Sequence, residues 1–298
     1  MKRILLASLL VFCSLRAQAD AGDPEVKLVS PGKAPTKTLR FAPTKGTTQG
    51  VVMTMKMQMA IKMGTIDMPA TKLPAMKMYA DLTVTDVSPN GDIRYDYKLG
   101  KIDVDNDPAS PPAVVNAMRD ALKGAEGITG KARVTSRGFT REMELSVPAT
   151  ANPQLKQMLD SMKESMRQLT APLPDEAVGV GAKWQTKYRI KQNGMEVQQT
   201  ADNELVSVSG NVAKVKTTLK QTADRQPMNP PGLPAGASVE LIELKSSGSG
   251  LSEVDLTKLM PTSGSMQLKS NTKAHIKMSG QEQDMATDLD MTVDVKKR

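Results

Sequence analysis

Hydrophobic and polar residues alternate strictly between residues 51 and 63. The apolar positions of this run are Met53, Met55, Met57, Met59, Ile61 and Met63. A two-residue period puts successive side chains on opposite faces of a strand, whereas a helical period of 3.6 residues would spread these methionines around the circumference. The run therefore predicts one long β-strand with a methionine-rich face.

The same period recurs on both sides of several turn sequences. These turns are Ser88-Pro89-Asn90-Gly91, Gln192-Asn193-Gly194, Ser209-Gly210-Asn211 and Ser279-Gly280. Asn-Gly between alternating segments is a strong hairpin signal, because both residues tolerate the positive φ that a tight hairpin turn requires. The sequence thus predicts a mainly β protein built from antiparallel hairpins.

Two segments carry a helical period instead. Residues 112–123 place Val114, Val115 and Met118 on one face, with Pro112 in the first turn, where its missing N–H costs nothing. Residues 152–169 begin with Asn152 as an N-cap and Pro153 at the first helical position. We therefore expect two amphipathic helices in an α+β protein.

Strands this long twist and curl, so their apolar sides should line a concavity, which the helices would plug. The expected fold is a half-barrel-like, curled antiparallel sheet. The expected lining residues are Met53, Met55, Met57, Met59, Met63, Met76 and Met78. A methionine-lined concavity suits an apolar ligand, because thioether side chains adapt to irregular shapes.

A weak internal echo indicates a duplicated β module. Residues 82–99 and 204–219 both read as a strand, a serine-containing turn and a second strand. We expect a first module at 38–175 that contains both helices and a second module at 176–298. Residues 20–37, with three prolines and little periodicity, are expected to form a flexible linker.

Residues 1–19 have the features of a secretory signal peptide. Lys2 and Arg3 precede an apolar stretch, and Ala17-Gln18-Ala19 matches a cleavage site. We expect an exported protein of the periplasm or the extracellular space, with no transmembrane segment after processing, since no later apolar stretch approaches 20 residues. Cys13 is the single cysteine, so the processed chain would hold no disulfide.

Composition and charge narrow the classes of partner. The net charge of +8 falls to +5 once Lys2, Arg3 and Arg16 are removed, and basic residues alternate with acidic ones. This balance favours solubility over nucleic-acid binding, and we expect no nucleic-acid partner. Aromatic residues make up only 3% of the chain and its polar faces carry lysine and threonine, which argues against an outer-membrane barrel.

The sequence contains few candidates for chemistry. The 21 methionines could offer thioethers to a soft metal such as Cu(I), but core filling is the simpler interpretation. His275 alternates with lysines on a polar strand face, and the Asp103, Asp105, Asp107 series departs from a calcium loop at Pro108 and Val114. We predict no catalytic residue, no metal site and no cofactor, and hence a protein that is not an enzyme.

Two strand entries carry a resemblance. LRFAPTKGTTQG and LPDEAVGVGAKWQ each lead into a long alternating strand, and Val178 to Trp184 fit a V-x-x-G-x-x-W motif. In these features the chain resembles an exported bacterial family of uncharacterised function. The expected curled sheet is also similar, less specifically, to the half-barrels of periplasmic lipoprotein and lipid carriers.

These features together favour an exported, non-catalytic binding module for a lipid or another apolar ligand. The alternative is a structural or protein-interaction module of the bacterial envelope with a closed core, whose partner would be an envelope protein. The two alternatives differ in whether the concavity is open or filled.

Overall fold

The computed structural model describes residues 24–106, 110–122, 124–146, 172–192, 195–229, 233, 236–278 and 280–298. Within these residues the chain is almost entirely β, with one helix, α1 (Pro112–Leu122). The strands are β1 (Glu25–Ser30), β2 (Thr48–Met63), β3 (Ile66–Lys72), β4 (Met76–Val87), β5 (Ile93–Val104), β6 (Thr129–Val134), β7 (Thr140–Ser146), β8 (Lys183–Gln192), β9 (Met195–Ser209), β10 (Val212–Ala223), β11 (Gln226–Met228), β12 (Ser238–Asp255), β13 (Ser263–Met278) and β14 (Gln281–Lys297).

All of these strands belong to one antiparallel sheet, in the order β1-β8-β9-β10-β12-β13-β14-β2-β4-β5-β6-β7. Short β11 pairs with β12, and β3 pairs with β2. The strands of the two predicted modules form two adjacent blocks of this sheet, β8 to β14 and β2 to β7, which are joined where β14 pairs with β2 over thirteen residues of each strand. The division into two modules stays a prediction.

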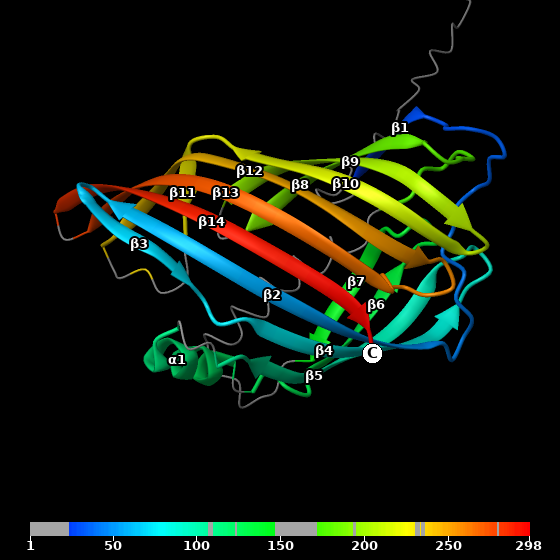
Figure 1. The fold of residues 1–298 in the computed structure, drawn as a ribbon, viewed down its shortest axis with the longest axis horizontal. Helices are drawn as coiled ribbons and strands as arrows, with labels where there is room; N and C mark the ends of the chain where they lie inside the picture. The colour runs from blue at the N-terminus through cyan, green and yellow to red at the C-terminus, as the bar shows by residue number, and fades with distance from the viewer. Residues whose placement is uncertain are drawn as a thin grey trace, which may run out of the picture.

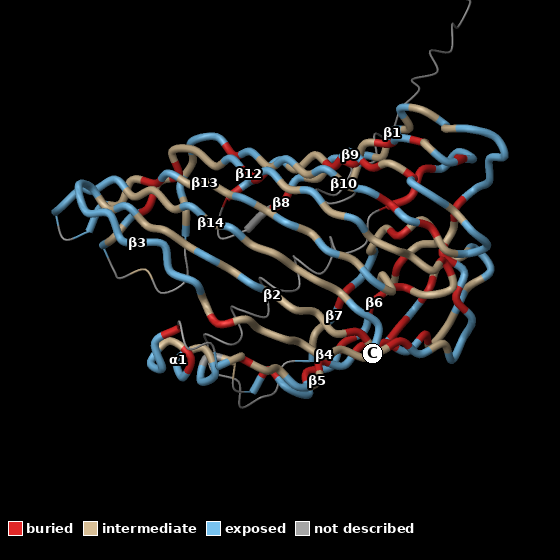
Figure 2. Tube along the Cα trace, viewed as in Figure 1, coloured by how far each residue is buried: buried red, intermediate tan, exposed pale blue. Residues whose placement is uncertain are grey.

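The sheet curls so that its two edges approach each other without joining (Figure 1). We call the surface that bears the core the inner face and the opposite surface the outer face. Along the direction of the strands, one end of the curled sheet is filled, and we call it the packed end. There a single core cluster joins Trp184 and Leu205 of β8 and β9 to Tyr95 and Met143 of β5 and β7. Figure 2 shows the buried residues gathered there.

Two details show how tightly the packed end is closed. Trp184 is 1% exposed, and its indole N–H donates to the carbonyl of Pro172 at 3.1 Å. The ring of Tyr97 lies over Gly130, where an added Cβ would come within 2.3 Å of the ring carbon. Glycine at this position thus leaves room for the aromatic ring between β5 and β6.

Away from the packed end, the strands β13, β14 and β2 continue as a trough whose inner face is only partly covered. Their burial alternates between intermediate and exposed residues, with few buried ones. A smaller core cluster, built on Ile190, Val197 and Leu241, covers part of the inner face on the side of β8 to β12. The trough therefore runs between this cluster and the β4 side of the sheet.

The loop between β12 and β13, residues 256–262, folds into the curl and separates the packed end from the trough. Leu256 and Leu259 are buried in the main core cluster. Gln49, which is 6% exposed, holds the loop backbone: its Oε1 accepts from the N–H groups of Leu259 at 3.2 Å and Met260 at 3.0 Å. Its Nε2 donates to the carbonyl of Met260 at 2.7 Å.

The long strand over residues 51–63 and the hairpins at Asn90-Gly91, at Gly210 and at Gly280 are confirmed. Gly91 has a φ of 85° and closes the β4–β5 turn by donating to the carbonyl of Ser88 at 2.9 Å. Residues 193 and 194 lie outside the described residues, but Gln192 lies opposite Met195 in the hairpin they join.

The helix expected at 112–123 is confirmed as α1, which packs beside β5 with Val115 buried. Its place at the border of the sheet in Figure 1 differs from the expected plug over the concavity. The second expected helix, 152–169, and the signal peptide, 1–19, lie outside the described residues. The part of the chain that the structure describes thus contains one helix, and the expectation of two is not supported.

The expected linker, residues 20–37, differs from the structure over 25–30. These residues form β1, which pairs antiparallel with β8 from Glu25↔Lys187 to Leu28↔Trp184. Val26 and Leu28 pack against the main core cluster. The short alternation of Val26 and Leu28 is enough to form an edge strand because the apolar residues of β8 provide a surface to cover.

Substituting Gln49 with leucine tests the role of the loop anchor. Leucine keeps the volume but leaves two N–H groups and one carbonyl of the loop without partners, at about 1–3 kcal/mol for each buried group. We expect the free energy of unfolding to fall by about 3 kcal/mol in urea denaturation. The control is Gln58→Leu, at an exposed position of the same strand; an equal loss in both variants would contradict the anchor.

Candidate functional site

The inner face of the trough carries a ladder of apolar side chains that oppose one another across the strand pairs. Met57 lies opposite Met291 of β14, and Met63 lies opposite Met285. Directly opposed residues of antiparallel strands have Cβ atoms about 4.5–5.5 Å apart, which is close enough for their side chains to pack together. The methionines expected from the alternation thus share one wall with those of the last strand.

The register places the remaining predicted residues on the same face. Met53 and Met55 lie between Val295 and Val293 of β14 on one side and Met78 and Met76 of β4 on the other. Met59 lies opposite Leu289. All seven predicted methionines are of intermediate burial, neither sealed in a core nor fully exposed to solvent.

A cavity of about 320 Å³ lies inside the curl, next to the loop that Gln49 anchors. It lies at the lower end of the 300–1,000 Å³ range usual for small-molecule sites. Its lining includes Met53, Thr186, Tyr188, Gln199, Ala201, Asn203, Thr217, Leu219, Ser252, Met260, Pro261, Met266, Val293 and Val295. Of the seven predicted methionines, Met53 lines this cavity. Met55, Met57, Met59 and Met63 lie along the trough on β2, while Met76 and Met78 lie on β4, where Met78 packs against a small core cluster of Leu99, Ala125 and Ile128.

One wall of the cavity holds a cluster of neutral polar groups. Asn203 is 2% exposed, and its Oδ1 accepts from the hydroxyl of Thr217 at 2.8 Å. Its Nδ2 donates to the hydroxyl of Thr186 at 3.3 Å and to the carbonyl of Ala201 at 3.4 Å. Buried amides need such partners, and here the partners themselves line the cavity.

A pair of glutamine amides lies beside this cluster. The Nε2 of Gln221 donates to the Oε1 of Gln199 at 2.7 Å, and Gln199, whose amide nitrogen carries two further N–H donors, lines the cavity. Tyr188 faces the same space, and burial raises the pKa of its phenol above the ordinary value. The tyrosine is therefore neutral at physiological pH.

Sequence reasoning missed this polar wall. Gln199, Ala201 and Asn203 share the inner face of β9 with Val197 and Leu205. The signal was present, because polar residues break the apolar series at alternate positions of a strand. Polar interruptions alone do not identify a site, because only the curl of the sheet brings these residues to the cavity opposite Met266.

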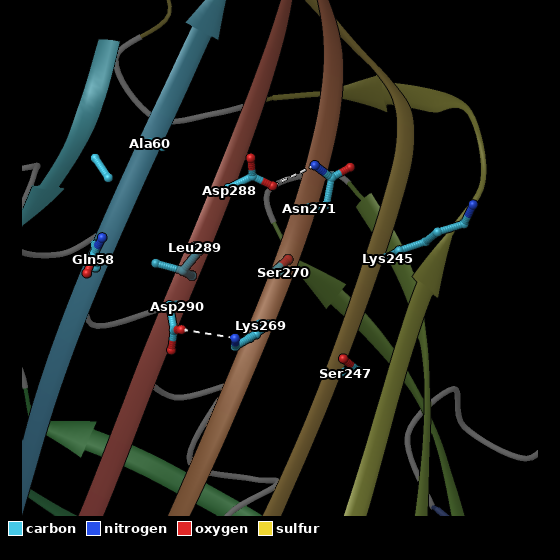
Figure 3. Close-up of a pocket in the computed structure, with 11 residues that line it drawn as sticks. Gln58, Ala60, Lys245, Ser247, Lys269, Ser270, Asn271, Asp288, Leu289 and Asp290 are labelled. Atoms are coloured by element: carbon cyan, nitrogen blue, oxygen red, sulfur yellow. Dashed lines mark hydrogen bonds and ion pairs between the residues drawn. The ribbon is translucent and has the colours of Figure 1, made fainter. Parts of the chain in front are cut away.

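The outer face has a groove of different character. The space, about 440 Å³, crosses β2, β14, β13 and β12, and Figure 3 shows the alternate outward side chains around it. Asn271 donates to Asp288 at 2.8 Å, and Lys269 pairs with Asp290 at 3.6 Å. Because Asp288 meets an amide and Asp290 meets an ammonium group on the neighbouring strand β13, these polar residues are partnered within the sheet and stabilise its register.

Residues considered earlier for metal binding are engaged elsewhere. Asp103 pairs with Lys101 and Asp105 with Lys77, at 2.5 and 3.1 Å, while Asp107 lies outside the described residues. Within the described part of the chain, no group of three or more His, Cys, Asp or Glu side chains is arranged to hold a metal ion. His275 lies on the outer face, with its Nδ1 2.8 Å from Asp284.

The fold and the cavity define an open, curled antiparallel sheet with an apolar trough and one neutral polar wall. Residues 149–261 match a family of unknown function, DUF6263. The matched stretch includes β8 to β12, the V-x-x-G-x-x-W motif and the polar wall, and it assigns no ligand. No match was found among curated proteins.

No helix in the described ranges has the length and apolar character needed to cross a membrane.

The single histidine offers a test of the outer-face register. The hydrogen bond to Asp284 raises the pKa of His275 above its ordinary value of 6.5, so its stabilising effect is complete below about pH 6.5. This stabilisation is lost as the pH rises through the pKa that His275 has in the folded protein. We expect an NMR titration to give a pKa above 6.5 that Asp284→Asn lowers. The control Asp288→Asn, on the same strand, should leave it unchanged; no difference between the variants would exclude this register contact.

Proposed function

We propose that this protein is a non-catalytic binding module that holds a lipid or another apolar ligand on the inner face of its curled sheet. The observation that carries the proposal is the incomplete burial of the apolar trough next to a cavity of about 320 Å³. Contiguous apolar surface of this kind usually has a partner, since its removal from water is favourable by about 25 cal/mol per Å² before the entropic cost of association is subtracted.

The residues of the trough support an apolar ligand of variable shape. Paired methionines such as Met57 and Met291 are unbranched and polarisable, so they adjust to chains that differ in length or in unsaturation. Val293 and Val295 line the cavity with branched side chains that are stiffer than those of methionine. The proposed ligand-lining set comprises Met53, Met55, Met57, Met59, Met63, Met76 and Met78, together with the cavity residues.

The chemistry of the cavity supports binding rather than catalysis. Its polar groups are amides, hydroxyls and one phenol, and burial keeps the phenol neutral. General acid–base catalysis needs a group that exchanges protons near the working pH. The lining residues offer hydrogen bonds instead.

We further propose that the protein is exported to the periplasm or the extracellular space. The basis is the pattern of residues 1–19 and the confinement of the single cysteine to that segment. An exported lipid-binding module would present its ligand to the envelope or carry it through an aqueous compartment.

A second candidate is a structural or protein-interaction module. The main core cluster, which joins the two edges of the sheet through Trp184 and Tyr95, favours it, because such a rigid end needs no ligand. In that case the trough would be covered by a protein partner in the envelope. Native mass spectrometry distinguishes the two candidates, since a co-purified small molecule supports the first and a clean unliganded mass the second.

A pair of neighbouring residues on β13 gives a matched test. Met266 points into the cavity, whereas Gln267 is exposed on the outer face. We expect Met266→Lys to weaken the binding of a fluorescent acyl lipid about tenfold or more, because it puts a charge against the apolar ligand. Gln267→Lys should bind like the unaltered chain.

The measurement is a fluorescence titration, with circular dichroism to verify that both variants keep their strands. Equal affinity in Met266→Lys and Gln267→Lys would place the lipid elsewhere. Absence of any uptake by the unaltered chain would remove the lipid-binding proposal and leave the protein-interaction module.

A further inference from the structure

We infer that the cavity takes the polar end of an uncharged amphiphile, one whose head carries hydroxyl, ester or amide groups and neither a carboxylate nor a phosphate. The inference rests on the proposed lipid-binding function and specifies its ligand class. It is carried by the chemistry of the cavity wall, which the methionine ladder does not determine.

The first observation is the absence of charge around the cavity. Among the described residues that line it, there is no Asp, Glu, Lys, Arg or His, although such residues are frequent in the chain as a whole. The charged residues of the same strands point to the outer face, where Lys269 and Asp290 pair with each other. An anionic head in this cavity would therefore lose its hydration without gaining a cation.

The second observation is the hydrogen-bonding capacity of the polar wall. The Thr217 hydroxyl donates to Asn203 and keeps lone pairs as acceptors, while the Thr186 hydroxyl accepts from Asn203 and keeps its proton as a donor. The Gln199 amide, which accepts from Gln221, adds two N–H donors. Donors and acceptors thus lie side by side, which suits a hydroxyl or an amide head that needs both.

The third observation is the asymmetry of the site. The neutral polar wall comes from β8, β9 and β10, while the facing wall comes from Met53, Met266, Val293 and Val295. The facing wall continues without interruption into the trough through Met55 and Met57. A ligand with its head at Asn203 and Gln199 would extend its chain along this ladder.

The volume of the cavity agrees with a ligand whose head lies in the cavity and whose chain lies in the trough. About 320 Å³ suits a head group with the first part of a chain, and the open trough receives the remainder. A long-chain monoacylglycerol, a fatty alcohol or an N-acyl amide has this form. A fatty acid shares the chain and differs only in its ionised head.

The test is a competition experiment with the purified full chain and a fluorescent monoacylglycerol as the reporter. Monooleoylglycerol and oleyl alcohol compete against oleate and oleyl phosphate at about pH 8, where the acids are ionised. We expect the neutral ligands to bind about tenfold or more tightly than the anionic ones. Oleate should gain affinity as the pH falls and its carboxyl becomes protonated.

Equal or tighter binding of oleate or oleyl phosphate at about pH 8 would overturn the inference and leave the lipid-binding function standing. If no lipid in the panel bound, both the neutral-head inference and the lipid-binding function would be contradicted. The two failures are therefore distinguishable in a single experiment.

Adjacent glutamines on β9 provide a second, matched test. Gln199 lines the cavity, and Gln198 is exposed on the outer face. Gln199→Lys supplies the missing cation, so we expect it to raise the affinity for oleate relative to monooleoylglycerol about tenfold, while Gln198→Lys keeps the preference of the unaltered chain. An unchanged preference in a folded Gln199→Lys variant would contradict the placement of the head at this wall.

Discussion

The structure depends on the burial of one face of a single long antiparallel sheet. Strands of 16 to 18 residues cannot lie flat, because each has its own right-handed twist, and the sheet they form must curl. The curl brings β5 to β7 against β8 to β10, and Trp184 and Tyr95 then share one core. Once that end is packed, the same strands continue beyond it as a trough. Both the cavity and the methionine ladder follow from this continuation.

The inner face is chemically divided along the sheet. The central strands present thioethers and aliphatic groups, whereas β8 to β10 add Asn203, Gln199 and their hydroxyl partners near the Gln49-anchored loop. The Asn203 amide bonds to the hydroxyls of Thr186 and Thr217, and the Gln199 amide bonds to Gln221, so these groups are satisfied in an apolar setting without ionised groups. A site of this kind distinguishes ligands by the charge of their head more than by the shape of their chain.

Local periodicity was sufficient to predict the strand at 51–63, the hairpins and α1, since each depends on residues close in sequence. It was insufficient where tertiary packing decided. β1 forms because β8 offers an apolar surface to Val26 and Leu28, and the serine- and glycine-rich β12 is held by its neighbours on both sides. The pairing of β14 with β2 carries no local signal. The polar wall was missed because Asn203 and Gln199 become site residues only after the curl places them opposite Val293 and Met266.

That pairing of β14 with β2 has a consequence for how the chain reaches its folded state. Val295 lies opposite Met53, and the N–H of Arg298 bonds to the carbonyl of Gly50 at 2.9 Å, so the middle of the sheet joins two segments that lie far apart in the sequence. Contacts of such separation form slowly, since a very large loop must close first. The two flanks can assemble as hairpins during synthesis, but the pairing between them must wait until β14 has been synthesised. Until then the edge of β2 that pairs with β14 has no partner strand, and the two parts of the sheet remain unjoined.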